Sequence, residues 1–133
     1  MMFARRELLF LLAGAFSLAC SGDAGGEDTG PEPGTLGVTF VTPNPDDGAV
    51  MLQVTGIIDS VVAVPPYRLL SARPSTEVTR VIVTGDLGDG LLFRVFVPDL
   101  AGTGSLGVEI MQVAQQGTYS QRSLAGYGLV VQP

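Results

Sequence analysis

Beyond position 35, apolar residues recur at every second position, and this spacing is typical of β-strands with one buried face. Residues 36–41 and 50–55 alternate in this way between large apolar side chains and smaller or polar ones. Further candidate strands lie at 58–64, 67–71, 78–84, 91–97, 106–114 and 124–131. No window after Cys20 has the apolar stripe of an amphipathic helix. The pattern therefore predicts an all-β fold.

Turn-forming residues separate these candidate strands at regular intervals. Glycine, proline and aspartate cluster at 43–48, 65–66, 85–90, 98–99 and 102–104. Seven to eight short strands that are separated by turns at regular intervals are typical of an antiparallel β-sandwich. The roughly 100 residues from 35 to 133 can build one such core but hardly two, so we expect a single sandwich domain there.

The segment 91–97 has the clearest alternation and supplies a candidate binding site. We expect Leu91, Phe93, Val95 and Val97 to face the core, which leaves Leu92, Arg94 and Phe96 on the opposite face. Arginine and aromatic residues are enriched at interaction hot spots, so Arg94 and Phe96 are candidate partner-binding residues. In the alternative interpretation, a loop or neighbouring strand covers Phe96, and Arg94 reaches water along its aliphatic stem.

Residues 20–34 precede the strand pattern and have a different composition. From Ser21 to Gly34 the chain holds glycine, proline, serine and acidic residues, with no aliphatic side chain larger than alanine. Such a segment cannot bury enough apolar surface to offset the entropy of ordering, so we predict a flexible acidic tether. A metal site among its acids is the alternative.

The first 19 residues have the layout of an export signal. Arg5 and Arg6 precede an apolar run from Leu8 to Ala19. A dozen apolar residues match the core of a signal peptide, whereas a helix that spans a membrane needs about 20. We therefore predict that residues 1–19 are removed.

The end of that run, Ser17-Leu18-Ala19-Cys20, resembles the signal of bacterial lipoproteins. The resemblance implies that Cys20 becomes the lipid-carrying first residue of the mature protein and anchors it in a membrane. Ser17 departs from the family pattern, in which an aliphatic residue is usual, so ordinary secretion stays open, as does a buried cysteine. Ser21 follows Cys20 where some lipoproteins retained in an inner membrane carry aspartate, which favours the outer membrane.

Composition excludes several classes of chemistry. The chain has no histidine, no tryptophan and one cysteine, so it holds no Ser-His-Asp or Cys-His system, no histidine zinc site and no intrachain disulfide. Its net charge of −6 argues against nucleic acid as a partner, because binding to phosphates needs a basic surface. We expect no cofactor and no metal.

Acidic residues are the remaining candidates for chemistry. Asp86 and Asp89 lie in a glycine-rich turn where oxygens could converge on Ca²⁺, although ordinary turn formation explains the same residues. The pair Asp46-Asp47 has the same two interpretations. Two carboxylates can also hydrolyse glycosides, and the acids available for such a pair are Asp59, Asp86, Asp89, Asp99 and Glu109.

We predict different positions in the fold for two tyrosines near the C-terminus. Tyr127 alternates with Leu129 and Val131 and is expected in the core, whereas Tyr119 follows Gly117-Thr118 and is expected on a turn.

Two segments resemble pieces of cohesin-type and other immunoglobulin-like modules of exported bacterial proteins. Residues 48–64 look like two strands joined by a short turn, and residues 88–98 look like a turn followed by an alternating strand. The resemblance implies adhesion, scaffolding or ligand display. We therefore expect a lipid-anchored envelope protein that binds a protein or glycan partner without catalysis. The alternatives are a small carbohydrate-active enzyme and a purely structural envelope lipoprotein that associates with itself through a free sheet edge.

Overall fold

The computed structural model describes residues 30–133, and the predictions for the signal peptide, Cys20 and most of the tether lie outside these residues. The described chain forms eight strands and one short 3-10 helix. The elements are β1 (Gly34–Val41), β2 (Asp47–Thr55), β3 (Ser60–Ala63), β4 (Arg68–Ser75), β5 (Val78–Leu87), β6 (Gly90–Val97), η2 (Leu100–Ser105), β7 (Gly107–Gln115) and β8 (Gly128–Gln132).

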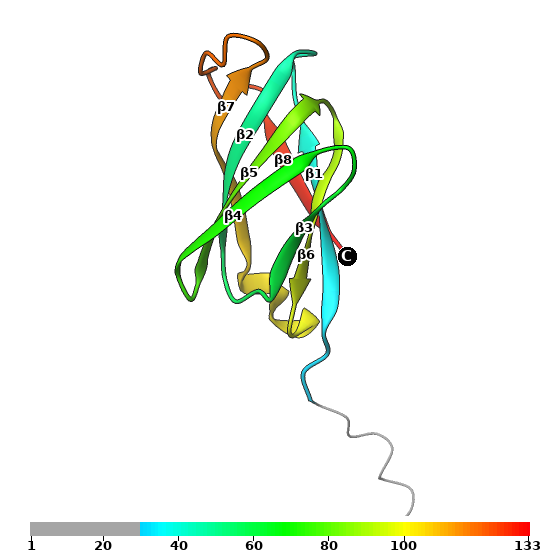
Figure 1. The fold of residues 1–133 in the computed structure, drawn as a ribbon. Coiled ribbons are helices and arrows are strands. Elements are labelled where there is room, and N and C mark those ends of the chain that lie inside the picture. Colours follow the sequence, from blue (N-terminus) through cyan, green and yellow to red (C-terminus); the bar gives the residue numbers. More distant parts are fainter. Residues whose placement is uncertain (1–29) are drawn as a thin grey trace, which may run out of the picture. The chain divides into compact units, whose positions relative to one another are not determined.

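The strands form two four-stranded antiparallel sheets that face each other (Figure 1). The first sheet has the order β3-β6-β1-β8, and the second has the order β4-β5-β2-β7. Every ladder is antiparallel. The prediction of an all-β sandwich with seven to eight strands is therefore confirmed.

The core lies between the sheets and consists almost entirely of aliphatic side chains from alternate strand positions. Leu36, Val38 and Phe40 of β1 are buried, as are Val50, Leu52 and Val54 of β2. β5 and β6 add Val81, Val83, Leu87, Leu92, Phe93, Val95 and Val97, and the core is completed by Ile58 of the β2–β3 connection and Val113 of β7. Buried apolar area is the main stabilising contribution, because the described chain has no disulfide.

The alternation in β6 is interrupted, which corrects part of the prediction for residues 91–97. Phe93, Val95 and Val97 are buried as expected, but Leu92 is fully buried and Leu91 is only half-buried. The β1–β6 register shifts here, since Val38 pairs with Phe93 whereas the next residue pairs with Leu91. A bulge at this point adds one residue to β6, so the faces of Leu91 and Leu92 are exchanged.

The predicted segment 48–64 holds two strands, β2 and β3, joined by residues 56–59, and the structure places these strands in opposite sheets. The last strand is shorter than predicted, since residues 124–127 form a loop and β8 begins at Gly128.

At the N-terminal end, residues assigned to the tether already contact the sandwich. Glu32 accepts a hydrogen bond from the Leu100 amide at 2.8 Å, and β1 starts at Gly34. The compact unit begins at Pro31.

Candidate functional site

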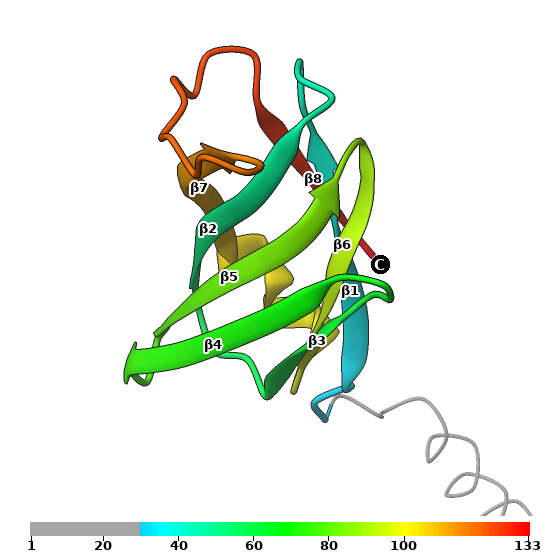
Figure 2. The same ribbon diagram turned by 45° about the horizontal axis from the view of Figure 1, so that its top comes forward.

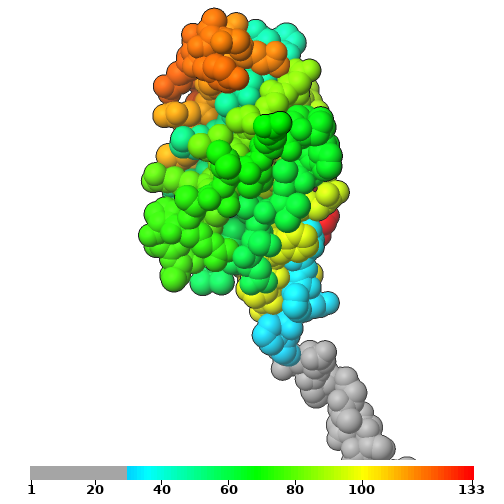
Figure 3. Space-filling model, viewed as in Figure 1, coloured from blue at the N-terminus to red at the C-terminus, as the bar shows by residue number. Residues whose placement is uncertain are grey.

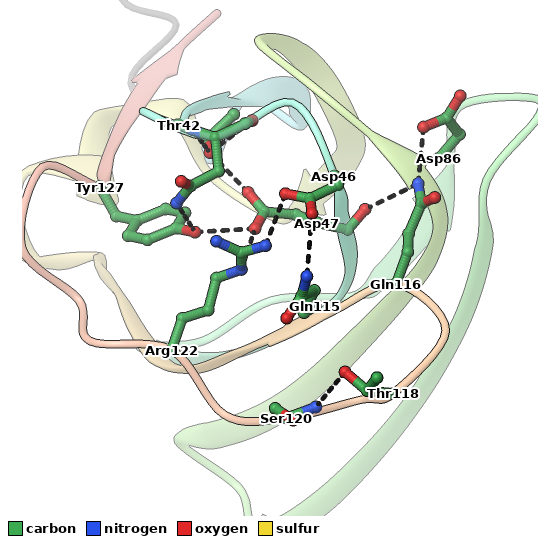
Figure 4. A network of polar contacts seen from close by, with 11 residues as sticks. Thr42, Asp46, Asp47, Asp86, Gln115, Gln116, Thr118, Ser120, Arg122 and Tyr127 are labelled. Atoms are coloured by element: carbon green, nitrogen blue, oxygen red, sulfur yellow. Dashed lines mark hydrogen bonds and ion pairs between the residues drawn. The ribbon is translucent and has the colours of Figure 1, made fainter.

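The end of the sandwich opposite the start of β1 carries two long connections side by side. One is residues 42–46, between β1 and β2, and the other is residues 116–127, between β7 and β8 (Figures 2 and 3). A backbone hydrogen bond joins them, in which the Gln116 amide donates to the Asp46 carbonyl at 2.8 Å. Polar side chains from both connections meet there (Figure 4).

Asp47 is the centre of this polar network and is fully buried. The Tyr127 hydroxyl donates to Asp47 Oδ1 at 2.7 Å, and the Thr42 hydroxyl donates to Oδ2. Asn44 Nδ2 donates in turn to the Tyr127 hydroxyl oxygen at 2.7 Å. A buried carboxylate is tolerated only when hydrogen bonds or a cation compensate for its lost hydration, and Asp47 has both.

The cation is Arg122, which lies between two neighbouring carboxylates. Its Nη2 pairs with Asp46 Oδ1 at 2.5 Å, and its Nε lies 3.3 Å from Asp47 Oδ1. Nε is buried and makes no hydrogen bond, so its attraction to Asp47 is electrostatic. Gln115 Nε2 donates to the second oxygen of Asp46 at 3.0 Å. Arg122 therefore balances two acids that the sequence places side by side.

Tyr127 links this polar network to the core. Its ring stacks on Phe40 with centroids 5.7 Å apart, so Tyr127, predicted in the core, packs against the core as a half-buried residue. Burial, followed by the hydrogen bond to Asp47, raises the pKa of the Tyr127 hydroxyl above its usual value of 10.0. The hydroxyl therefore acts as a hydrogen-bond donor at neutral pH.

Except for Arg122 Nε, the polar side-chain groups around Asp46 and Asp47 are hydrogen-bonded to one another. Both carboxylates accept hydrogen bonds from side chains, and the network connects residues up to 83 positions apart. These contacts fix the 116–127 connection to the sandwich. The attached connection in turn covers the charged side chain of Asp47.

Asp86 and Asp89, the candidate Ca²⁺ ligands, lie near the β5–β6 turn and are directed to separate protein groups. Asp86 Oδ1 accepts from Gln116 Nε2 at 2.7 Å, whereas Asp89 Oδ1 accepts from the Thr42 amide at 2.8 Å. No group of three or more metal-ligating acids, histidines or cysteines occurs within residues 30–133. Gly90 in this turn has a φ of +142°, a conformation that favours glycine. The two aspartates therefore attach the β5–β6 turn to the 116–127 and 42–46 connections.

The other candidate acids are dispersed over the sandwich. Asp99 caps η2 by accepting from the Ala101 amide at 3.1 Å. Asp59 and Glu109 are exposed on different segments, next to β3 and in β7. These acids therefore do not form one site.

Arg94 and Phe96 lie on the outer face of the β3-β6-β1-β8 sheet, as the alternation predicts. Arg94 is exposed and makes no side-chain hydrogen bond or ion pair to any residue in the described range 30–133. Phe96 is half-buried, between Thr35 of β1 and Ser60 of β3 in the ladder. Because these neighbours are small, the sheet itself leaves part of the ring uncovered.

Beside Arg94 the outer face is hollowed. Arg94 pairs with Gly37 of β1, which has no side chain, and with Val62 of β3, which is 50% exposed. An open depression of about 330 Å³, here called the Gly37 hollow, is lined by Thr35, Gly37, Thr39, Leu91, Arg94, Gln132 and Pro133. A cationic side chain thus stands at the rim of a depression with a mixed apolar and polar lining.

Sequence reasoning missed the network and the hollow for different reasons. The Asp46-Asp47 pair was visible, but its partner Arg122 lies more than 70 positions away, and nothing in the local sequence connects them. The one sequence signal for this ion pair was that Arg122 is the single charged residue between positions 110 and 133. The hollow depends on the β1–β6 register, which places Gly37 opposite Arg94.

Tyr119 was predicted on a turn, and it lies in the turn that follows β7, with a φ of 56° and 65% of its surface exposed.

Comparison with protein-family models, curated proteins and solved structures found no match for the chain. Among the residues from 30 onward, no helix is long and apolar enough to cross a membrane.

Proposed function

We propose that this protein is a non-catalytic binding module of the bacterial cell envelope. Lipid on Cys20 holds it in a membrane, the outer membrane rather than the inner one, and the sandwich engages a protein or glycan partner. The observation that supports a binding role most strongly is the outer face of the β3-β6-β1-β8 sheet. It presents the uncommitted guanidinium of Arg94 beside Phe96 and the Gly37 hollow.

The chemistry of this face suits recognition. A guanidinium offers a planar fork of donors to carboxylate or hydroxyl oxygens, and a partly exposed aromatic ring offers apolar area at small cost in conformational entropy. Both side chains are carried by β6, which is paired on both sides and is therefore held rigidly. A site on a rigid strand needs little ordering when a partner binds.

The immunoglobulin-like resemblance supports the same class of role, namely adhesion, scaffolding or ligand display. Catalysis by paired carboxylates has less support. The two adjacent acids, Asp46 and Asp47, are both paired with Arg122 and hydrogen-bonded to neighbouring side chains. The rival enzyme would require two acids that face a substrate.

A crosslinking pull-down from envelope membranes tests the binding face. The full-length chain is compared with the double variant Arg94→Ala/Phe96→Ala. The matched control is Arg68→Ala/Leu70→Ala, which removes an arginine and an apolar residue at the same spacing from β4 of the other sheet. Arg68 is exposed and Leu70 is 70% exposed, so the control should fold normally.

We expect one partner to be captured by the wild-type chain and the control but lost from the Arg94/Phe96 variant. Loss from the control alone would move the site to the opposite sheet. Capture that is equal in all three chains would refute a role for either face.

The anchor has its own test. Metabolic labelling with a radioactive fatty acid should mark the wild-type chain and not Cys20→Ser, and the variant should leave the membrane fraction. Labelling that persists in Cys20→Ser would refute the proposed lipidation site.

A further inference from the structure

β8 is an edge strand with a free side. It pairs with β1, and no strand within residues 30–133 pairs with its other side. A free edge presents a row of unpaired amide and carbonyl groups, and another extended strand can pair with it. Proteins usually protect such edges by short length, charge, proline or a covering segment.

The other three edges of the sandwich carry these protections. β3 is only four residues long. β4 contains Arg68, Arg73 and Pro74, and its pairing is irregular between Ala72 and Ser75. In β7, the C-terminal part is already paired, because the Arg122 amide donates to the Val113 carbonyl at 2.8 Å. The remainder of β7 carries Glu109.

β8 is five residues long, one more than β3, and it lacks the other protections. Its sequence is Gly-Leu-Val-Val-Gln, with no charge and no proline, and residues 123–133 hold no charged side chain. Val130 is 41% exposed and Val131 is 39% exposed. In an acidic chain with a net charge of −6, two β8 strands can pair without repulsion between charged side chains of the strands themselves, and the nearest acid is Glu109 of β7, across the neighbouring groove.

We infer that β8 pairs with β8 of a second copy of this chain, antiparallel and centred on Val130. A twofold axis then sets Val130 against its own symmetry mate and Leu129 against Val131 of the other copy. Leu129 and Val131 lie on the core side of the sheet in both copies, and Val130 lies on the outer side. The strand is thus complementary to itself in this register, with apolar side chains opposite apolar ones.

This pairing would merge two four-stranded sheets into one and place two copies of the Arg94 face on the same side. Such a dimer is bivalent, so a repetitive partner would be held more strongly than by a single copy. Two five-residue strands bury little surface compared with the roughly 1,200–2,000 Å² of stable interfaces. The dimer therefore forms when copies are concentrated in a membrane, and this part of the inference rests on the proposed anchoring through Cys20.

The register can be tested by disulfide trapping of the full-length chain in bacterial membranes. In an antiparallel pair, opposite Cα atoms are about 4.5–5.5 Å apart, which is within the range that a disulfide spans. Val130→Cys should therefore give a covalent dimer on mild oxidation. The matched control is Gln132→Cys, on the same strand and the same face. In this register the two Gln132 positions lie about 13 Å apart along the strands and should not be joined.

We expect at least about tenfold more dimer from V130C than from Q132C or from the wild-type chain, in which any Cys20 that carries no lipid sets the background. Equal trapping of V130C and Q132C would indicate random collision and overturn the inference. Trapping of V130C to a different protein would also overturn it and assign the edge to a foreign strand. Absence of V130C dimer while Val62→Cys reacts normally with a thiol reagent would overturn it as well.

A charge at the same position supplies a second measurement. Energy transfer between donor-labelled and acceptor-labelled full-length chains in membranes should fall for Val130→Lys, because two like charges would lie opposite each other. Val62→Lys, on the edge strand β3 and 50% exposed, should leave it unchanged. Equal transfer in both variants would overturn the inference. Disulfide trapping and energy transfer do not need the external partner. The results of both experiments are therefore independent of whether the Arg94/Phe96 variant loses that partner.

Discussion

The hydroxyl of Tyr127 offers the sharpest test of how this sandwich is held together. Tyr127→Phe keeps the ring that stacks on Phe40 and removes only the oxygen between Asp47 and Asn44. The buried Asp47 carboxylate then loses one of its two side-chain hydrogen-bond donors and cannot recover it from water, because Asp47 is fully buried.

The size of the effect follows from these contacts. A hydrogen bond to a charged group contributes about 1.5–3 kcal/mol, whereas Asn44 is half-exposed and can replace its lost acceptor with water. We therefore expect the free energy of unfolding to fall by about 2 kcal/mol at pH 7. For a domain of this size, that corresponds to a decrease in Tm of roughly 10 °C.

Urea unfolding of the compact unit, residues 31–133, followed by far-ultraviolet circular dichroism, measures this change. The control is Tyr119→Phe, since that side chain is 65% exposed and its hydroxyl makes no hydrogen bond to residues 30–133. It should change stability by less than about 0.5 kcal/mol. A Tyr127→Phe effect no larger than the control would refute the argument that this hydroxyl stabilises a buried charge.

We also expect the loss of stability caused by Tyr127→Phe to depend on pH. The pKa of Tyr127 is raised in the folded state, so the unfolded chain loses its tyrosine proton first as the pH rises above 10.0. The stability that the hydroxyl contributes is therefore fully present below pH 10 and declines as the pH rises from there through the folded-state pKa. The difference between wild type and Tyr127→Phe should shrink above pH 10, and a constant difference would contradict the assigned cause.

Other substitutions have distinct expected results in the same unfolding assay. Arg122→Met should cost about 3 kcal/mol, because the fully buried Asp47 loses its cation; a change under about 1 kcal/mol would contradict this. Leu52→Ala removes a fully buried core side chain and should cost about 2–5 kcal/mol, whereas a smaller loss would mean that the core collapses around the cavity. Gly48→Ala should destabilise by about 1–3 kcal/mol, since its Cβ would lie 2.9 Å from the Gln116 backbone, and unchanged stability would show that the 116–127 connection yields.

Much of the fold could be predicted from the sequence because the patterns that mark strands and turns depend on neighbouring residues only. The alternation of residues 36–41, 50–55 and 93–97 reports which side chains are buried, and the glycine and proline clusters report where strands end. Backbone geometry forces successive side chains to opposite faces, so a two-residue period needs no knowledge of distant residues. The same logic placed Arg94 and Phe96 on the outer face.

The prediction was wrong where the pairing partner decides the conformation. The exchange of Leu91 and Leu92 arises from a register shift against β1, and the sequence of β6 alone continues its alternation there. Two strands joined by a short turn were predicted in residues 48–64 and are present, but the sequence did not show that β3 pairs with β6 in the opposite sheet. A short connection between strands is compatible with pairing in one sheet or with a crossing to the other.

The candidate site divides in the same way. The sequence by itself determined an all-β chain, the outward direction of Arg94 and Phe96, and the exclusion of histidine and disulfide chemistry, because these depend on composition and on a local period. Only the tertiary structure brought Asp46 and Asp47 to Arg122, set Gly37 beside Arg94, and left β8 as an edge. These features depend on contacts between residues far apart in the chain, and such contacts are fixed by how the sheets pair and pack rather than by any local pattern.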